Sequence, residues 1–263
     1  MMKAVIDMHS ILRDLLMDQK GGITFHCFDA WHIGYILVFV SLAVWGAWYL
    51  RNKSAEKRSK VIGGFVTAAF VLYMADFFCM PLAYGEINVE KLPFHVCTTM
   101  CIMCFISRHN KALEKYKLQF AVLGFVSNLV YLLYPAGVMW YEVHPLSYRA
   151  VQTLAFHGVM MGYGALVLIY ESDGFVWKKC YRDLALVIIM TVWALLGNTM
   201  YNTAAKMYNW FFVIQDPFAM FPLETSVYIM PGLNIVLFFA AEMLVYWVFG
   251  SLKQKKVKTI QKG

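Results

Sequence analysis

Long apolar runs separated by short polar stretches organise this chain. The runs are long enough to form helices that cross a hydrocarbon core of about 30 Å at 1.5 Å per residue. They predict seven helices, at 31–50, 61–80, 93–107, 118–133, 148–170, 184–203 and 227–249. The third run has only about 15 residues, against the roughly 20 that a spanning helix usually needs. The pattern therefore predicts an all-α fold, a polytopic membrane bundle of seven transmembrane helices.

Basic residues alternate between rich and poor connections along the chain. The connections after the first, third and fifth runs and the carboxyl-terminal tail are rich in Lys and Arg. The other connections hold only Lys91, Arg149 and Lys206. Because Lys and Arg collect on the cytoplasmic side, we expect the amino terminus outside, the carboxyl terminus inside, and the chain in the cell membrane.

The connections are short, and we expect a single membrane domain over residues 1–263 with its bundle at 31–249. Residues 1–22 predict an amphipathic interfacial helix, because apolar side chains recur at helical spacing opposite charged ones. The apolar stripe is Val5, Met8, Leu12, Leu15 and Leu16. Residues 250–263 predict a basic cytoplasmic tail.

Composition agrees with this class of protein. The chain is 60% hydrophobic and 15% charged, whereas soluble domains carry about 25% charged residues. Its net charge of +7 is explained by topology and by attraction of the basic loops and tail to anionic inner-leaflet lipid. Nothing in it indicates a nucleic-acid partner, and the sequence identifies no protein partner.

Polar side chains inside the apolar runs share one depth. Measured along each helix from its basic boundary, Asp76, His95, Cys97, His157 and Asn198 lie about 16 to 24 Å into the bundle. Such groups are costly in hydrocarbon and usually face the bundle interior. Scattered structural residues have no reason to agree in depth, so the five predict a common site.

The short third run gives the strongest chemical signal. Pro93 suits the first position of a helix, which places Cys97 in the first helical turn. The unpaired N–H groups and the positive dipole end of that turn favour a nucleophilic cysteine and can stabilise an oxyanion. The sequence therefore predicts Cys97 as a nucleophile.

His157 is the stronger candidate for the base. On a helix, His95 and Cys97 point about 200° apart, so His95 can serve Cys97 only if the backbone there is unwound. His157 lies at similar depth on another helix and is followed by glycines that permit close helix approach, at positions 158, 162 and 164. A Cys97–His157 pair oriented by Asn198 or Asp76 would complete a nucleophile, base and orienter arrangement.

Simpler interpretations stand beside this one. A buried cysteine is often a small hydrophobe, and a buried histidine often a hydrogen-bonding link between helices. The stripe Cys97, Cys101 and Cys104 supplies too few convergent ligands for a metal, so we expect neither a metal nor a cofactor. Glu242 reads as a structural or relay carboxyl outside the main site.

Cys27 and Cys79 would both lie near the outer face. The sequence favours two free thiols over a disulfide there.

Three motifs resemble those of a known family. Leu92-Pro93-Phe94-His95-Val96-Cys97 resembles the L-P-L-H-L-C motif of the YwaF-like bacterial integral membrane proteins, which are similar to the animal transmembrane protein 164 acyltransferases. Phe156-His157-Gly158 resembles their H-H-G element, and Gly197-Asn198-Thr199-Met200 their G-T-N-Y-M element. The chain departs from the pattern where Phe156 replaces a histidine and Thr199 an aromatic residue.

The resemblance implies transfer of an acyl chain between phospholipids through a nucleophilic cysteine, at the position of Cys97. We therefore expect a lipid acyltransferase or lipid hydrolase whose substrate is a membrane phospholipid. A transporter or channel with a path through Asp76, His95, His157 and Glu242 is the alternative. A non-catalytic membrane scaffold is a second alternative.

Overall fold

The computed structural model describes residues 22–84, 89–172 and 180–260, and these form helices and connecting turns without a strand. Residues 1–21, most of the predicted amphipathic helix, lie outside the described part. The elements are α2 (Ala30–Leu50), α3 (Ala55–Tyr84), the 3₁₀ helix η1 (Val89–Lys91), α4 (Val96–Ser107), α5 (Lys111–Glu114), α6 (Lys117–Leu133), α7 (Ala136–Met139), α8 (Tyr148–Tyr170), α9 (Cys180–Tyr201), the 3₁₀ helix η3 (Trp210–Phe212) and α10 (Leu223–Ile260).

The predicted all-α membrane class is confirmed. Five helices of the described chain, α2, α3, α8, α9 and α10, are long and apolar enough to cross a membrane. The other two predicted spans are the shorter apolar helices α4, with 12 residues, and α6, with 17. A count of seven spanning helices and the sidedness of the two termini stay predictions.

Some helices begin or end at other residues than the sequence predicts. α3 begins at Ala55 rather than at position 61, because helix-forming residues continue the helix and Glu56 pairs with Lys60 at 2.7 Å, one turn apart. α10 continues through the predicted tail to Ile260. α4 begins at Val96, three residues after position 93. Apolar runs locate the buried part of a helix and not its polar ends.

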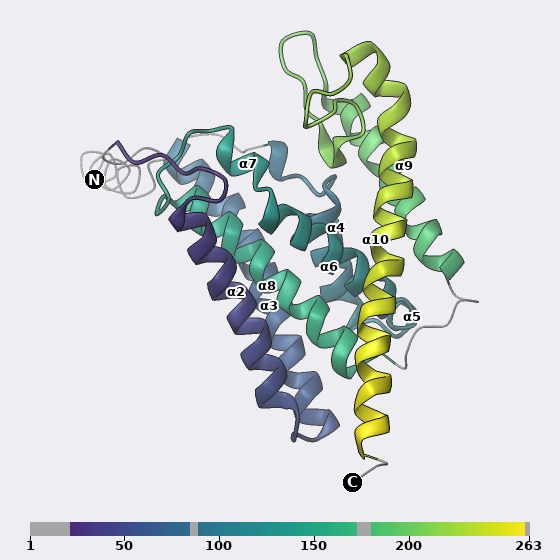
Figure 1. The fold of residues 1–263 in the computed structure, drawn as a ribbon. Coiled ribbons are helices and arrows are strands. Elements are labelled where there is room, and N and C mark those ends of the chain that lie inside the picture. Colours follow the sequence, from purple (N-terminus) through teal and green to yellow (C-terminus); the bar gives the residue numbers. More distant parts are fainter. Residues whose placement is uncertain (1–21, 85–88, 173–179, 261–263) are drawn as a thin grey trace.

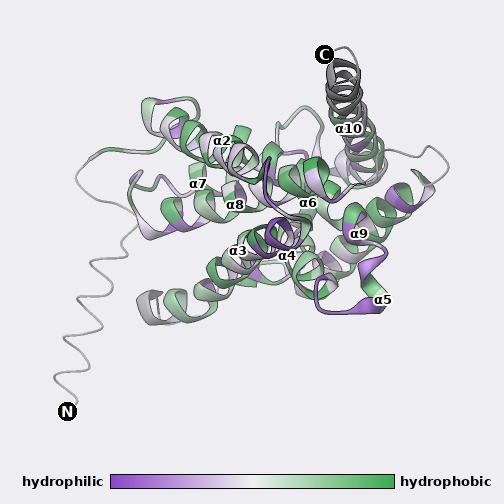
Figure 2. Ribbon diagram, turned by 90° about the horizontal axis from the view of Figure 1, so that it is seen from below, coloured by the Kyte–Doolittle hydropathy of each residue, from purple (hydrophilic) through white to green (hydrophobic). Residues whose placement is uncertain are grey.

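α8 is the centre of the bundle and packs against α2, α3 and α6; in Figure 2, α2 lies above it and α3 below it (Figures 1 and 2). Each of the three glycines of α8 faces a different neighbouring helix. An added Cβ would meet Phe39 of α2 at Gly158 and Phe65 of α3 at Gly162. At Gly164 it would meet Ala121 and Phe125 of α6. A Cβ at Gly164 would lie 2.7 Å from the Ala121 carbonyl oxygen. Small residues thus let α6 and α8 approach closely.

α6 also packs against α4, and α9 and α10 lie side by side on the flank opposite α2 (Figure 1). Coloured by hydropathy, the helices are largely hydrophobic along their length, and the hydrophilic residues gather at α5 and at helix ends (Figure 2). The three helices that carry the predicted nucleophile, base and a linking segment, α4, α8 and α6, therefore meet inside the bundle.

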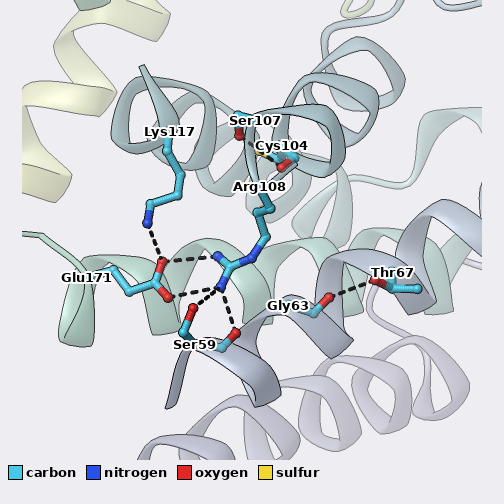
Figure 3. Close-up of polar contacts among 8 residues, drawn as sticks. All are labelled: Ser59, Gly63, Thr67, Cys104, Ser107, Arg108, Lys117 and Glu171. Atoms are coloured by element: carbon cyan, nitrogen blue, oxygen red, sulfur yellow. Dashed lines mark hydrogen bonds and ion pairs between the residues drawn. The ribbon is translucent and has the colours of Figure 1, made fainter. Parts of the chain in front are cut away.

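An ion cluster holds one end of these helices together (Figure 3). Arg108, which caps the carboxyl end of α4, makes two contacts of 3.0 Å with the carboxylate of Glu171, which caps α8. Lys117 of α6 adds a 3.0 Å ion pair to Glu171, and Arg108 donates to the carbonyl of Ser59 in α3 at 2.7 Å. Bidentate geometry makes this type of pair strong. We call this end of the bundle the Arg108 end, and the opposite end the His95 end.

Candidate active site

The α4 start

Cys97 lies in the first turn of α4, at the second helical residue, and its side chain is buried. The sequence predicts a helix that begins at Pro93, whereas the chain from Pro93 to His95 is non-helical and His95 is the N-cap with φ −74° and ψ 140°. A proline fits before a helix as well as at its first position. The later start still leaves the first-turn N–H groups, including that of Cys97, without helical partners.

The base and its partner

The side chain of His157 contacts the amide of Asn128, a residue that is not among the predicted site residues. Nδ1 of His157 lies 2.7 Å from Oδ1 of Asn128 in α6. The Asn128 amide is itself oriented, because its Nδ2 donates to the carbonyl of Gly124 at 2.6 Å. Since Oδ1 only accepts, the proton of a neutral His157 sits on Nδ1, which leaves Nε2 unprotonated and able to act as a base.

α6 packs against both α4, which carries Cys97, and α8, which carries His157. Ser127, the neighbour of Asn128 along α6, donates its hydroxyl to the Gly124 carbonyl at 3.2 Å. Tyr131, one turn further along, stacks on the His157 imidazole with ring centroids 3.7 Å apart and an interplanar angle of 13°. Two side chains of α6, Asn128 and Tyr131, thus hold His157 of α8, while the same helix packs against α4.

Three predicted residues with other partners

The backbone of His95 is extended rather than helical, which is the unwound conformation that a role beside Cys97 requires. Its Nδ1 accepts the backbone N–H of Phe211 at 3.3 Å. A neutral His95 therefore carries its proton on Nε2, where it is a hydrogen-bond donor and not a base.

Asn198 holds a loop and does not orient the histidine. Its Oδ1 accepts the backbone N–H of Trp210 at 3.1 Å, and its Nδ2 donates to the Trp210 carbonyl at 3.3 Å. Asn202, one turn later, makes the same pair of contacts with Tyr208, at 2.6 and 3.1 Å. The two asparagines thus bind the backbone of Tyr208 and Trp210, at and just before η3.

Phe94 packs this loop against the start of α4. Its ring lies against Trp193 and Trp210, both with centroids 5.0 Å away. A Cβ at Gly197 would lie 2.4 Å from the Phe94 ring, so only glycine leaves room for it. The G-N pair of the third motif therefore has a packing role at Gly197 and a loop-binding role at Asn198.

Asp76 is likewise bound elsewhere. Its buried carboxylate forms an ion pair with Lys91 at 2.8 Å and accepts the hydroxyl of Tyr148 at 3.0 Å. In the structure α6 holds His157 and packs against α4, which carries Cys97, while Asn198 and Asp76 have other partners. The amide that contacts His157 is that of Asn128.

The sequence gives little indication of a role for Asn128, because it lies in an otherwise apolar run with no motif around it. The one feature that marks it is an amide side chain in the middle of a membrane segment, next to Ser127. Such a side chain needs a buried partner.

Other thiols and carboxyls

The six cysteines are free thiols, Cys27 and Cys79 among them. Within the described residues, no group of three or more His, Cys, Asp or Glu side chains is placed to hold a metal ion. Glu242 of α10 is fully buried, and neither of its carboxylate oxygens has a hydrogen-bond partner within the described part of the chain. It interacts with Asp183 of α9, which accepts the hydroxyl of Tyr246.

Comparison with known proteins

The fold and the site define a helical, polytopic membrane protein with a cysteine, a histidine and an amide gathered inside the bundle. The chain belongs to the TMEM164 family, whose family model matches residues 27–252. The match spans every element from α2 to the membrane part of α10, and all the site residues described above. No curated protein and no solved structure matches the chain.

Proposed function

We propose that the protein is a membrane acyl-transfer enzyme, a phospholipid acyltransferase or hydrolase, with Cys97 as nucleophile and His157 as base. The observation that carries the proposal is the 2.7 Å contact between His157 Nδ1 and Asn128 Oδ1, with the amide fixed by the Gly124 carbonyl. Cysteine, histidine and asparagine are a known variant of the hydrolase triad. Membership of the TMEM164 family is in keeping with this chemistry.

In the first half-reaction, Nε2 of His157 takes the proton of the Cys97 thiol. The sulfur attacks the carbonyl carbon of a phospholipid ester and forms a C–S bond. The first-turn N–H groups of α4 and Nε2–H of His95 supply donors for the oxyanion. When the C–O bond to the glycerol oxygen breaks, that oxygen receives the proton from His157 and leaves as the hydroxyl of a lysophospholipid.

In the second half-reaction, a hydroxyl group attacks the Cys97 thioester. His157 takes the proton of that hydroxyl, the C–S bond breaks, and the sulfur regains a proton. If the hydroxyl belongs to a second lysophospholipid, the reaction is acyl transfer. If it belongs to water, the reaction is hydrolysis. Phe94 packs against Trp193 and Trp210 at the α4 start, and apolar surroundings of this kind would favour transfer over hydrolysis by limiting the access of water.

The substrate would reach Cys97 from the surrounding lipid. α4 and α6 are shorter than a full span, with 12 and 17 residues, so the His95 end of α4 lies below the ends of the longer helices. We place the protein in the cell membrane, with its basic loops and carboxyl-terminal segment on anionic lipid of the inner leaflet.

The decisive experiment is the intact mass of the purified protein after incubation with phospholipid vesicles, with and without hydroxylamine. We expect an acyl-sized, hydroxylamine-labile adduct in the wild type and none in Cys97→Ser. Cys101→Ser is the matched control, because Cys101 is a buried thiol one turn further along α4, and it should keep the adduct. A folded wild-type protein without an adduct would overturn the proposal.

A transporter is the second candidate, and the buried, unpartnered carboxylate of Glu242 favours it. Intramembrane carboxyls of this kind often carry protons or ions. Asp76, by contrast, is neutralised by Lys91 on another side of the bundle, at a separate cluster from Asp183 and Glu242. Proton-coupled uptake into liposomes that survives Cys97→Ala and fails in Asp76→Asn or Glu242→Gln would establish this function instead.

A further inference from the structure

The ring of Tyr131 lies flat on the imidazole of His157. The two ring centroids are 3.7 Å apart and the ring planes differ by 13°. Tyr131 and Asn128 are three residues apart on α6, so they face the same neighbouring helix. Asn128 contacts the imidazole at its edge, where Oδ1 lies 2.7 Å from Nδ1, whereas Tyr131 covers one ring face. One helix therefore fixes both the proton-bearing nitrogen and the ring plane of His157.

The hydroxyl end of the Tyr131 side chain lies against α7. A Cβ added to Gly137 would lie 2.8 Å from the Tyr131 hydroxyl oxygen, and its three nearest atoms would all belong to Tyr131. Gly137 is not among the residues with a positive φ, so this contact, and not its backbone conformation, accounts for a glycine there. Because the hydroxyl is directed at Gly137, the face of the tyrosine ring is the part that acts on His157.

A second proton on the imidazole of His157 would place a positive charge inside the bundle. His157 is buried, and a buried charge is costly unless another group stabilises it. The ion pairs of the described chain do not include His157. Two groups in contact with the ring suit a positive charge: the Asn128 oxygen and the electron-rich face of Tyr131.

The stack between Tyr131 and His157 suits a charged imidazole better than a neutral one. Neutral aromatic rings prefer offset or edge-to-face pairs with centroids about 4.5 to 7 Å apart. A centroid distance of 3.7 Å between nearly parallel rings is closer than that. A cation over the face of a tyrosine ring is attracted by the ring quadrupole. The contact therefore strengthens when His157 becomes charged, and such an interaction accelerates the step that creates the charge.

We propose that Tyr131 is a positioning residue of the acyl-transfer reaction. It holds the imidazole plane of His157 at Asn128 and stabilises the imidazolium that forms when Nε2 takes the thiol proton of Cys97. The proton moves from Sγ to Nε2, and no bond to Tyr131 forms or breaks. Gly137 leaves the space that this position of Tyr131 needs. The inference rests on the proposed function for the step that is accelerated, whereas the contact with His157 is independent of that function.

The first test is the rate of thioester formation at Cys97, measured by time-resolved intact mass. Tyr131→Leu removes the ring face and should lower the rate about tenfold, the size of a desolvated cation–π contact. Tyr131→Phe keeps the ring face and should keep the wild-type rate. Tyr134→Leu is the matched control, because Tyr134 is a half-buried tyrosine at the end of the same helix whose ring lies against Phe218. Its rate should not change.

Gly137 allows the same stack to be disturbed and then restored. Gly137→Ala places a methyl group against the Tyr131 hydroxyl and should lower the rate, because the ring must move. Combining Gly137→Ala with Tyr131→Phe removes the clashing oxygen, and the nearest remaining atom lies at 3.8 Å, an ordinary contact. The double variant should therefore regain the wild-type rate. This recovery also keeps the test decisive if Tyr131→Leu does not fold, as judged by its melting temperature.

A second readout needs no turnover. In protein with ¹⁵N-labelled histidine, the NMR shifts of the two ring nitrogens report which of them carries the proton, and His157→Gln identifies the signals of His157. We expect well-separated signals in the wild type and Tyr131→Phe, because one tautomer is held at Asn128. In Tyr131→Leu the two signals should move closer together, because the freed ring exchanges between tautomers.

The outcomes separate the role of Tyr131 from the acyl-transfer function. Wild-type rates in both Tyr131→Leu and Gly137→Ala would overturn the positioning role and leave the thioester chemistry intact. Equal losses in Tyr131→Leu and Tyr131→Phe would also overturn it, because the ring face would then not be the active part. If the wild type forms no thioester, acyl transfer fails and the NMR signals decide: signals that converge in Tyr131→Leu support positioning of His157, and unchanged signals refute it.

Discussion

Arg108 and Glu171 join the far ends of the two helices that carry the proposed nucleophile and base. Arg108 is the C-cap of α4, whose first turn contains Cys97. Glu171 is the C-cap of α8, which contains His157. Their two contacts of 3.0 Å are reinforced by Lys117 (Figure 3). Burial raises the pKa of the Glu171 carboxyl, but the hydrogen bonds and charges of Arg108 and Lys117 outweigh it, and the net pKa is lowered.

This lowered pKa predicts a pH dependence of stability. An unfolded glutamate has a pKa of about 4.3. The stabilisation by ionised Glu171 is therefore fully present above that pH and is lost as the pH falls through the lower pKa of the folded state. Glu171→Gln should lower the free energy of unfolding near neutral pH by about 3 kcal/mol, because it leaves Arg108 without its buried partner. Thermal unfolding in detergent across this pH range measures both effects.

Glu56→Gln is the matched control for Glu171→Gln. Glu56 also pairs with a basic residue, Lys60, but the two side chains are 77% and 75% exposed. Exposed pairs contribute little. An equal loss of stability in both variants would show that the buried cluster has no special role.

The amide of Asn128 should matter for chemistry more than for stability. Asn128→Leu fills similar volume but removes the acceptor that fixes the proton of His157 on Nδ1. We expect the rate of thioester formation at Cys97 to fall about a hundredfold, the size of a general-base contribution. Time-resolved intact mass measures this rate.

Gln119→Leu supplies the comparison, since Gln119 is a buried amide on the same helix whose Oε1 has no hydrogen-bond partner among the described residues. Its rate should match that of the wild type. Equal rates in Asn128→Leu and the wild type would exclude Asn128 from the mechanism.

The sequence predicts the membrane class and the position of the helices, because apolar length is a local property. Depth and the short third run indicate His95, Cys97 and His157 as candidates, and their role in a site stays a prediction. The sequence does not indicate Asn128, since its role depends on which face of α6 meets α8. α6 is buried over most of its circumference, so its sequence pattern does not identify that face. Periodicity gives no direction on a helix that is apolar all round.

The roles of Asn198 and Asp76 depend on contacts that no spacing rule contains. Asn198 binds Trp210, which lies in a loop after the helix, and Asp76 binds Lys91 across the next connection. Equal depth was the reason for placing them in the site. Depth fixes the layer in which a side chain lies but not its neighbours within that layer.

The approach of α6 to α8 predicts a strong effect at one glycine. A Cβ at Gly164 would lie 2.7 Å from the backbone oxygen of Ala121, which cannot rotate away. Gly164→Ala should therefore separate the helices and destabilise the protein by about 1 to 3 kcal/mol. At Gly64 of α3 no atom of the residues that the structure describes lies within 4 Å of an added Cβ, so Gly64→Ala should leave the melting temperature unchanged or raise it. Thermal unfolding of both variants tests the contrast, and similar melting temperatures for the two would contradict the close contact.

Asn198 offers the sharpest separation between a structural and a chemical role. Asn198→Ala leaves the N–H and the carbonyl of Trp210 without partners in a buried place, which should cost about 2 kcal/mol and loosen η3. We expect faster proteolysis in the segment 203–222 for this variant. Asn202→Ala should show a smaller effect, because the contacts of Asn202 are only partly buried and water can replace them. An Asn198→Ala protein that keeps wild-type protection of this segment, yet no longer forms the Cys97 thioester, would instead make Asn198 part of the catalytic group.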